Sequence, residues 1–180
     1  MLGIQPVSII LCFALVLLSA CSSVRVSDYE SMRPLLKTEA FFDGKLSAHG
    51  VLKDRSGKVI RTFNADIKAY WQDGVGTLEE DFVFDDGEEQ RRVWTLVPNG
   101  EGRYIGTAGD VIGESAIEVS GNSMFLDYVL RVPYGDGTID VTIDDRMYLV
   151  SPTVLINEST LSKWGFNVGS LLLVIEKRSN

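Results

Sequence analysis

Strand-like segments follow one another closely from Gly44 to the end of the chain. The breaks between them are short and rich in residues that suit tight reversals, as in Asp73-Gly74, Pro98-Asn99-Gly100 and Gly121-Asn122. Such breaks leave no room for crossover helices, so we expect neighbouring strands to pair antiparallel. The expected strands cover residues 45–52, 59–71, 76–84, 90–97, 102–108, 115–120, 123–132, 138–149, 153–157 and 170–176.

Alternation of apolar and polar side chains within these segments predicts a sheet with one face directed toward a core. Phe63, Ala65 and Ile67 fall on one side of a strand, whereas Asn64 and Asp66 fall on the other. About ten antiparallel strands leave exposed edges unless the sheet closes on itself. The sequence therefore predicts an all-β fold, in which an antiparallel meander is closed or nearly closed into a barrel. A two-sheet β-sandwich is the alternative.

One hairpin has a register that its residues specify. If Asp85-Asp86-Gly87 forms a three-residue loop with its glycine in the left-handed region, Glu80 lies opposite Arg92. The same register places Leu78 opposite Trp94. A two-residue turn would shift the pairing by one residue and lose both matches, so we predict the three-residue loop.

The N-terminal residues have the pattern of a secretory signal, because an apolar run over residues 7–18 leads into small side chains. The sequence Leu18-Ser19-Ala20-Cys21 resembles the lipobox of bacterial lipoproteins, in which the thiol receives a diacylglyceryl group and the signal is cut just before it. The resemblance implies that Cys21 is the lipid attachment site. Because Ser22 rather than Asp follows, it also implies the periplasmic face of the outer membrane. An uncleaved anchor helix is the alternative, since no Lys or Arg precedes Cys21.

These features divide the chain into three expected parts. A lipoprotein signal peptide covers residues 1–20, a lipidated tether covers 21–28, and a single barrel domain covers 29–180. A short helical segment is expected at the start of this domain, between residues 29 and 42, where Pro34 interrupts a helical spacing of apolar side chains.

Cysteine content and charge exclude several classes of function. Cys12 would leave with the signal and Cys21 would be lipidated, so no thiol would remain for a disulfide, a Cys-ligated zinc site or a catalytic cysteine. The chain has 25 Asp and Glu against 17 Lys and Arg, a formal net charge of −8. An acidic chain lacks the basic footprint of a nucleic-acid-binding protein. Its expected membrane contact is the lipid on Cys21.

Several motifs between residues 41 and 177 carry a family resemblance. They are Phe82-Val83-Phe84-Asp85-Asp86-Gly87-Glu88, Arg92-Val93-Trp94, Tyr104-Ile105-Gly106, Gly109-Asp110-Val111-Ile112-Gly113, Gly121-Asn122, Asp144-Asp145-Arg146-Met147-Tyr148-Leu149, Asn157 and Lys163-Trp164-Gly165-Phe166. With these motifs the chain resembles a family of uncharacterised bacterial lipoproteins that carries a domain-of-unknown-function label. The family's sheet-rich pattern is similar to the lipocalin group, whose small barrels hold hydrophobic molecules. The resemblance implies a barrel and a lipid-related role.

The pair of Glu80 and Arg92 is the main candidate for a binding site. Alternation places Glu80 on the apolar face of its strand, so an interior face would bury an ion pair. Such a pair would either orient the polar head of a ligand or be a self-satisfied part of the core. The aromatic side chains suit either a ligand cavity or a packed core. The ligand-binding candidates are Glu80, Arg92, Trp94, Tyr104 and Tyr128.

Other motifs are interpreted as structural. The acidic run over residues 79–89 lacks EF-hand spacing, and the glycine-containing segment 106–113 lacks the ending of a phosphate loop. The single histidine, His49, is expected to be a surface or strand residue. We therefore expect no catalytic residue, no metal and no cofactor. The sequence Trp164-Gly165-Phe166, between two expected strands, is interpreted as a plug for one end of the barrel.

Three functions remain to be compared. The first is a binding module that holds or carries a hydrophobic ligand such as a fatty acyl lipid, and an apolar-lined cavity would favour it. The alternative is a non-enzymatic envelope protein, structural or interacting with a protein partner, and a filled barrel core with an exposed apolar patch would favour it. An enzyme is the least expected function, because no nucleophile–base set was found in the sequence.

Overall fold

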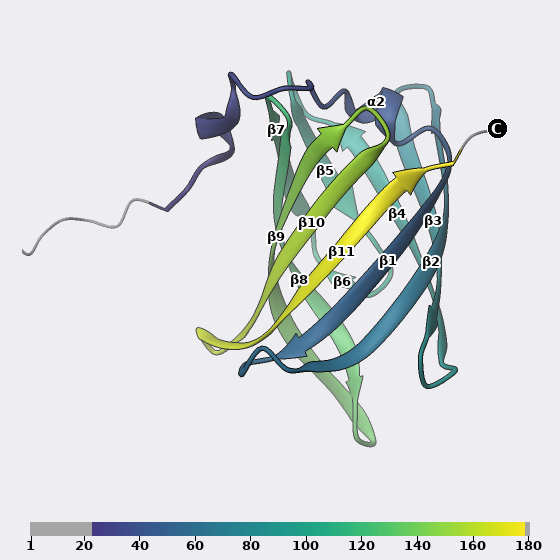
Figure 1. Ribbon diagram of the computed structural model, residues 1–180, viewed down its shortest axis with the longest axis vertical. Coiled ribbons are helices and arrows are strands. Elements are labelled where there is room, and N and C mark those ends of the chain that lie inside the picture. Colours follow the sequence, from purple (N-terminus) through teal and green to yellow (C-terminus); the bar gives the residue numbers. More distant parts are fainter. Residues whose placement is uncertain (1–22, 179–180) are drawn as a thin grey trace, which may run out of the picture.

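The strands of the computed structural model, which describes residues 23–178, form one continuous antiparallel sheet that curls into a barrel (Figure 1). Most of them are joined in sequence by the short turns described above. The strands are β1 (Gly44–Asp54), β2 (Val59–Gln72), β3 (Val75–Phe84), β4 (Glu89–Pro98), β5 (Arg103–Thr107), β6 (Val111–Ile112), β7 (Ser115–Ser120), β8 (Ser123–Tyr134), β9 (Gly137–Ser151), β10 (Val154–Lys163) and β11 (Phe166–Lys177).

Pairing between β8 and β9 closes the barrel. The strand order is β6-β8-β7-β5-β4-β3-β2-β1-β11-β10-β9, and the additional pairing of β8 with β9 joins the two ends of the ring. The two-residue β6 pairs only with β8, so ten strands make up the closed wall. Closure pairs the edges that a flat meander would expose. The predicted barrel is confirmed, and the sandwich alternative is wrong.

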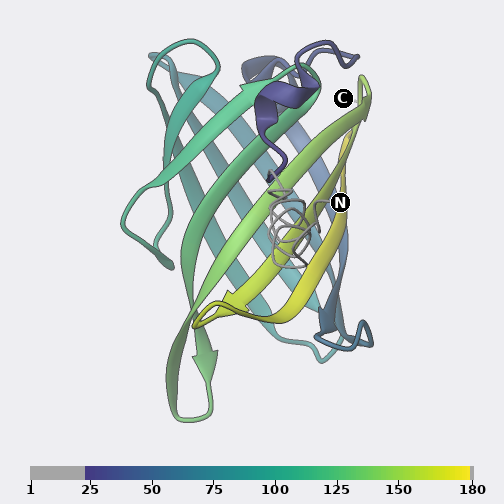
Figure 2. The same cartoon turned by 90° about the vertical axis from the view of Figure 1, so that its left-hand side faces the viewer.

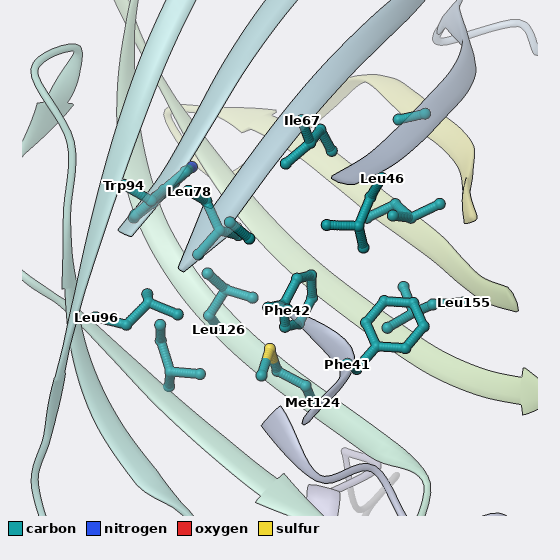
Figure 3. Close-up of a cluster of buried hydrophobic side chains, with 14 of the residues drawn as sticks. Phe41, Phe42, Leu46, Ile67, Leu78, Trp94, Leu96, Met124, Leu126 and Leu155 are labelled. Carbon is teal, nitrogen blue, oxygen red and sulfur yellow. The ribbon is translucent and has the colours of Figure 1, made fainter. Parts of the chain in front are cut away.

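Alternation along the strands separates the interior from the outer wall. Phe63, Ala65 and Ile67 of β2 are buried, and the intervening Asn64 and Asp66 are exposed. The same pattern on the other strands fills the interior with a continuous apolar cluster, part of which is drawn in Figure 3. Burial of this face on every strand fixes the pairing register, since a slip of one residue would turn the apolar side chains outward.

One end of the barrel is capped by the chain that precedes β1. The helix α2 (Thr38–Phe41) lies across this end, at the top of Figure 1. Phe41 and Phe42 are 4% and 2% exposed and point into the interior (Figure 3). Trp71 Nε1 donates a 2.8 Å hydrogen bond to the carbonyl of Phe42, which attaches the cap to β2. The hydrophobic contacts and this bond close the end of the barrel.

The segment before the cap lies against the outside of the barrel (Figure 2). A 3-10 turn, η1 (Val26–Tyr29), places the ring of Tyr29 5.6 Å from that of Phe125 and 5.4 Å from that of Tyr148. Gly121 has a φ of 57°, and a Cβ there would lie 1.7 Å from the carbonyl oxygen of Tyr29. Of the helical segment predicted between residues 29 and 42, the structure contains only the four-residue helix α2 beyond the end of η1.

The N-terminal predictions fall largely outside the described residues. The signal over residues 1–20, the lipid site at Cys21 and the first part of the tether over 21–28 lie there. Residues 23–178 contain no helix that is long and apolar enough to cross a membrane.

The predicted hairpin register is confirmed in detail. Gly87 has a φ of 83°, and the chain pairs Glu80 with Arg92 and Leu78 with Trp94 across β3 and β4. The amide of Gly87 donates a 3.0 Å hydrogen bond to the carbonyl of Phe84 and closes the three-residue loop.

The expected plug at residues 164–166 is wrong. The strands β10 and β11 extend well beyond the predicted 153–157 and 170–176 and meet in a tight hairpin at Trp164-Gly165. Trp164 and Phe166 are 85% and 74% exposed, so their rings project away from the interior. The strand was predicted to end at residue 157 because polar residues follow. In the structure these residues, Glu158 and Thr160, face outward, and the strand continues through them.

Candidate functional site

A cavity of about 110 Å³ lies inside the barrel. Its wall is mostly apolar and comes from side chains far apart in sequence, including Phe42 of the cap, Ala48, Leu78, Leu126 and Leu173. Figure 3 shows Phe42, Leu78, Trp94 and Leu126 directed toward one another in the interior. Toward the cap the interior side chains are buried, whereas Phe82, Leu171 and Leu173 are partly exposed. The cavity is therefore more accessible from the end opposite α2.

Arg92 brings a positive charge into this interior. Its guanidinium binds the carboxylate of Asp110 with Nε and Nη2, at 2.8–3.0 Å. The Arg92 side chain is 17% exposed and that of Asp110 is 36% exposed. The sequence-based expectation of a Glu80–Arg92 ion pair is wrong on this point, because the carboxylate within ion-pair distance of Arg92 is Asp110. The loop before β6 delivers Asp110 to the barrel wall.

Glu80 lies on the cavity wall beside this pair. Its side chain is half-buried and makes no hydrogen bond to the residues that the structure describes, although the positive charge of Arg92 lowers its pKa. Burial raises the pKa of Glu80 to about 7, and the attraction of Arg92 offsets only part of this effect. At neutral pH the side chain is thus divided between a carboxylate that accepts hydrogen bonds and a carboxylic acid that also donates one.

A second acidic group faces the cavity from β9. Asp145 accepts hydrogen bonds from Asn157 Nδ2 and, at 2.9 Å, from Ser159 Oγ, both on β10. All three side chains are buried. Burial raises the pKa of Asp145 to about 6, against the two hydrogen bonds, which favour the charged form. The carboxylate of Asp145 is therefore fixed by hydrogen bonds from neighbouring side chains, whereas that of Glu80 is not.

Tyr128 and Trp94 form the aromatic part of the wall. Their rings meet edge to face with centroids 5.3 Å apart. Burial raises the pKa of Tyr128 well above 10, so its hydroxyl is neutral and can donate a hydrogen bond. The site thus has a mostly apolar wall and three polar features. These are the Arg92–Asp110 ion pair, the hydrogen-bonded Asp145 and Glu80, which has no hydrogen bond within the described residues.

The family assignment follows from the sequence as a whole. The model of the family described as "Protein of unknown function (DUF3833)" matches residues 15–177. The chain belongs to this family. No curated protein sequence matches it significantly.

Several solved structures are similar to this DUF3833 chain. An S-type phycobiliprotein lyase from Guillardia theta is 14% identical, with 87% of this chain and 99% of the lyase covered and a TM-score of 0.54. A redesigned β-barrel is 9% identical, with 82% and 100% covered and a TM-score of 0.46. Another redesigned barrel, bound to DFHBI, is 10% identical, with 78% and 100% covered and a TM-score of 0.42. The likeness to the lyase indicates a shared fold.

The structure of the DUF3833 barrel places four of the five sequence candidates on the cavity: Glu80, Arg92, Trp94 and Tyr128. Tyr104 is not part of the cavity wall. Its hydroxyl donates a hydrogen bond to Glu39 of α2, so it helps to hold the cap. Whether the four cavity residues bind a ligand stays a prediction.

Sequence reasoning missed Asp110, Asp145, Asn157 and Ser159 as members of this polar group. The signal for Asp145 was present, because it alternates with Ile143 and Met147 on an apolar strand face. His49 is exposed on β1 and bonds Asn64 at 2.6 Å, as expected for a surface strand residue. Among residues 23–178, no group of three or more His, Cys, Asp or Glu side chains is placed to hold a metal ion.

Proposed function

We propose that the protein binds or carries a hydrophobic ligand, such as an acyl lipid, in the interior of the barrel. The observation that carries the proposal is Glu80, a half-buried carboxyl group that makes no hydrogen bond within the described residues, on a mostly apolar cavity wall. Binding sites for small molecules typically combine apolar walls with a few convergent polar groups. A ligand that donates a hydrogen bond to Glu80 would supply the partner that the described residues do not provide.

The charges around the cavity restrict the polar end of the ligand. The positive charge of Arg92 is already matched by Asp110, and Glu80 and Asp145 are both acidic. A free carboxylate would therefore meet acidic neighbours and no unmatched cation. We infer a ligand with a neutral or hydrogen-bond-donating end, such as an alcohol or an ester, in preference to an ionised fatty acid.

A second candidate function is that of a non-enzymatic interaction protein with a filled core. The size of the cavity favours it, because about 110 Å³ is below the range of roughly 300–1,000 Å³ that is typical of small-molecule sites. The cavity accommodates part of an acyl chain, and a longer ligand would extend through the more accessible end.

Filling the cavity is expected to abolish ligand binding. Ala48 is 3% exposed and lines the cavity, so Ala48→Leu places three further carbon atoms in the open space. We expect at least about a tenfold loss of affinity for an environment-sensitive naphthalene dye and for a medium-chain alcohol that displaces it. Fluorescence titration of the chain from Ser22 onward, which contains every strand of the barrel, measures both affinities.

Ala116→Leu is the matched control, since Ala116 is exposed on the outer face of β7. It should bind the dye and the alcohol as the unaltered protein does. Equal affinities for the unaltered protein and Ala48→Leu would contradict a ligand site at this cavity.

We propose further that the protein is a lipoprotein on the periplasmic face of the outer membrane, attached through Cys21. The sequence Leu18-Ser19-Ala20-Cys21 supports this proposal. Replacement Cys21→Ser should give an uncut precursor that incorporates no labelled palmitate in a bacterial host. A mature, labelled product from this variant would refute the assignment.

A further inference from the structure

Two aromatic side chains project from the barrel at the end opposite the cap. Trp164 and Phe166 stand at the tip of the β10–β11 hairpin and are 85% and 74% exposed. This tip lies at the lower end of the barrel in Figure 1, far from α2. Side chains that are exposed to this degree make few contacts within the fold, so the fold does not depend on their apolar surface.

The backbone at Trp164 makes this display unusual. Its φ is 49°, in the left-handed region where Gly or Asn is favoured and a bulky side chain is strained. The ammonium group of Lys163 lies 5.4 Å from the centroid of the Trp164 ring. The hairpin thus presents an aromatic ring with a cation beside it. Asn would fit the positive φ of this position with less strain than Trp.

The neighbouring hairpin adds basic side chains to the same edge. β1 pairs with β11, so the β1–β2 turn lies next to the start of β11. The turn carries Lys53, Arg55 and Lys58, and none of them is within ion-pair distance of a carboxylate in the described part of the chain. We call residues 53–58 and 163–168 the basic rim. It contains four basic side chains and one acidic side chain in a protein with a net charge of −8.

The other side of the same open end has the opposite charge. The β3–β4 turn at residues 84–89 contains four acidic side chains, of which Asp86 and Glu88 bind Arg61 at 2.7 and 2.6 Å. At this end of the barrel the basic rim and the acidic β3–β4 turn are thus separate. The β8–β9 hairpin also projects here, with Tyr134 72% exposed (Figure 1).

We propose that the basic rim docks on an anionic lipid bilayer. Tryptophan prefers the boundary between headgroups and acyl chains, where its ring is partly buried and its N–H remains hydrated. Lys and Arg beside it are attracted by anionic headgroups. Docking in this way brings the accessible end of the cavity to the membrane surface, and it requires neither residues 1–22 nor a ligand in the barrel.

Vesicle co-sedimentation of the chain from Ser22 onward tests the proposal, because this chain carries no lipid of its own. We expect binding to phosphatidylcholine vesicles that contain phosphatidylglycerol, and at most weak binding to phosphatidylcholine alone. Added salt should weaken the binding, since the basic side chains act through screened charges. Absence of binding to both kinds of vesicle, or equal binding to both, would overturn the proposal.

Two double variants separate the aromatic contribution from the basic one. Trp164→Asn with Phe166→Thr keeps residues that suit the hairpin and should weaken binding by at least about tenfold. Arg55→Gln with Lys58→Gln should weaken it by about 25-fold, or roughly fivefold for each basic side chain. Both variants should melt at the temperature of the unaltered protein, because the replaced side chains are exposed.

Matched controls come from the outer wall. Lys45→Gln with Lys68→Gln makes the same change in net charge at two exposed side chains that face each other across β1 and β2. Val150→Ser removes an apolar side chain that is 51% exposed on β9. Both should bind vesicles like the unaltered protein, and a loss as large as that of the rim variants would overturn the proposal. Ala48→Leu should also bind vesicles normally, so a failure of the ligand site is distinguished from a failure of the rim.

Discussion

Arg92→Met is expected to lower the free energy of unfolding by about 3 kcal/mol. The substitution removes the guanidinium that binds Asp110 and attracts Glu80, and it leaves both carboxyl groups without this cation. The loss should be at the lower end of the range for buried ion pairs, because the Asp110 side chain is 36% exposed. Urea unfolding at about pH 8, followed by tryptophan fluorescence, measures it.

The neighbouring arginine provides a control on the other face of the same strand. Arg91 binds Glu79 and Asp81 on the outer wall, and its side chain is 54% exposed. Arg91→Met removes an equal charge from an equal number of carboxylates, but it should cost much less stability than Arg92→Met, because such exposed pairs are solvated. Equal losses for the two variants would contradict the interior position of Arg92.

Glu80→Gln is expected to stabilise the protein at high pH. The pKa of Glu80 is about 7 in the folded protein and about 4.5 in the unfolded chain. The folded state therefore binds more protons between these values, and its stability falls as the pH rises from about 4.5 to about 7. The neutral amide escapes this loss, so the variant should be more stable than the unaltered protein by about 3 kcal/mol near pH 8.

At about pH 4 both forms are neutral at this position, and the advantage of Glu80→Gln should disappear. Part of the pH dependence should remain in the variant, because the pKa of Asp145 is also raised, to about 6. Glu79→Gln serves as the control. The pKa of Glu79 is lowered by hydrogen bonding to Tyr70, so this variant should gain no stability as the pH rises. A Glu80→Gln variant with the pH profile of the unaltered protein would show that Glu80 is well solvated.

Much of the barrel could be predicted from the sequence, because local signals agreed with one another. The alternation in β2 gave the buried face, and the match of Glu80 with Arg92 and Leu78 with Trp94 selected one hairpin register among two. Each of these signals depends on residues that are close in sequence. Closure of the barrel followed from the number of strands and the cost of unpaired edges.

The ion pair of the site could not be found in the same way. Asp110 lies 18 residues after Arg92, on a loop before the two-residue β6, and no strand pairing of Arg92 points to it. Its position depends on how β6 pairs with β8. Strand register alone indicated Glu80 as the ion-pair partner of Arg92. In the structure Asp110 takes that place, and Glu80 lies beside the pair.

The hairpin at Trp164 was misread for a different reason. The hydrophobicity of Trp164 and Phe166 predicts burial. Both residues are exposed because they lie at the turn of the β10–β11 hairpin. A bulky residue with a positive φ is uncommon, so Gly165 was the only turn signal that the sequence offered. Alternation and hairpin register placed Glu80, Arg92 and Trp94 on the inner face, whereas Tyr128 was included only as one of the aromatic side chains.

The central claim, that the barrel interior holds a hydrophobic ligand, is tested most directly by native mass spectrometry of residues 22–180. The protein should be expressed in the bacterial periplasm and purified without detergent. We predict a reproducible extra mass that extracts as a hydrophobic molecule with a neutral polar end, and that is missing from Ala48→Leu. A protein that has only its own mass, and takes up no offered alcohol, ester or fatty acid, would contradict the claim.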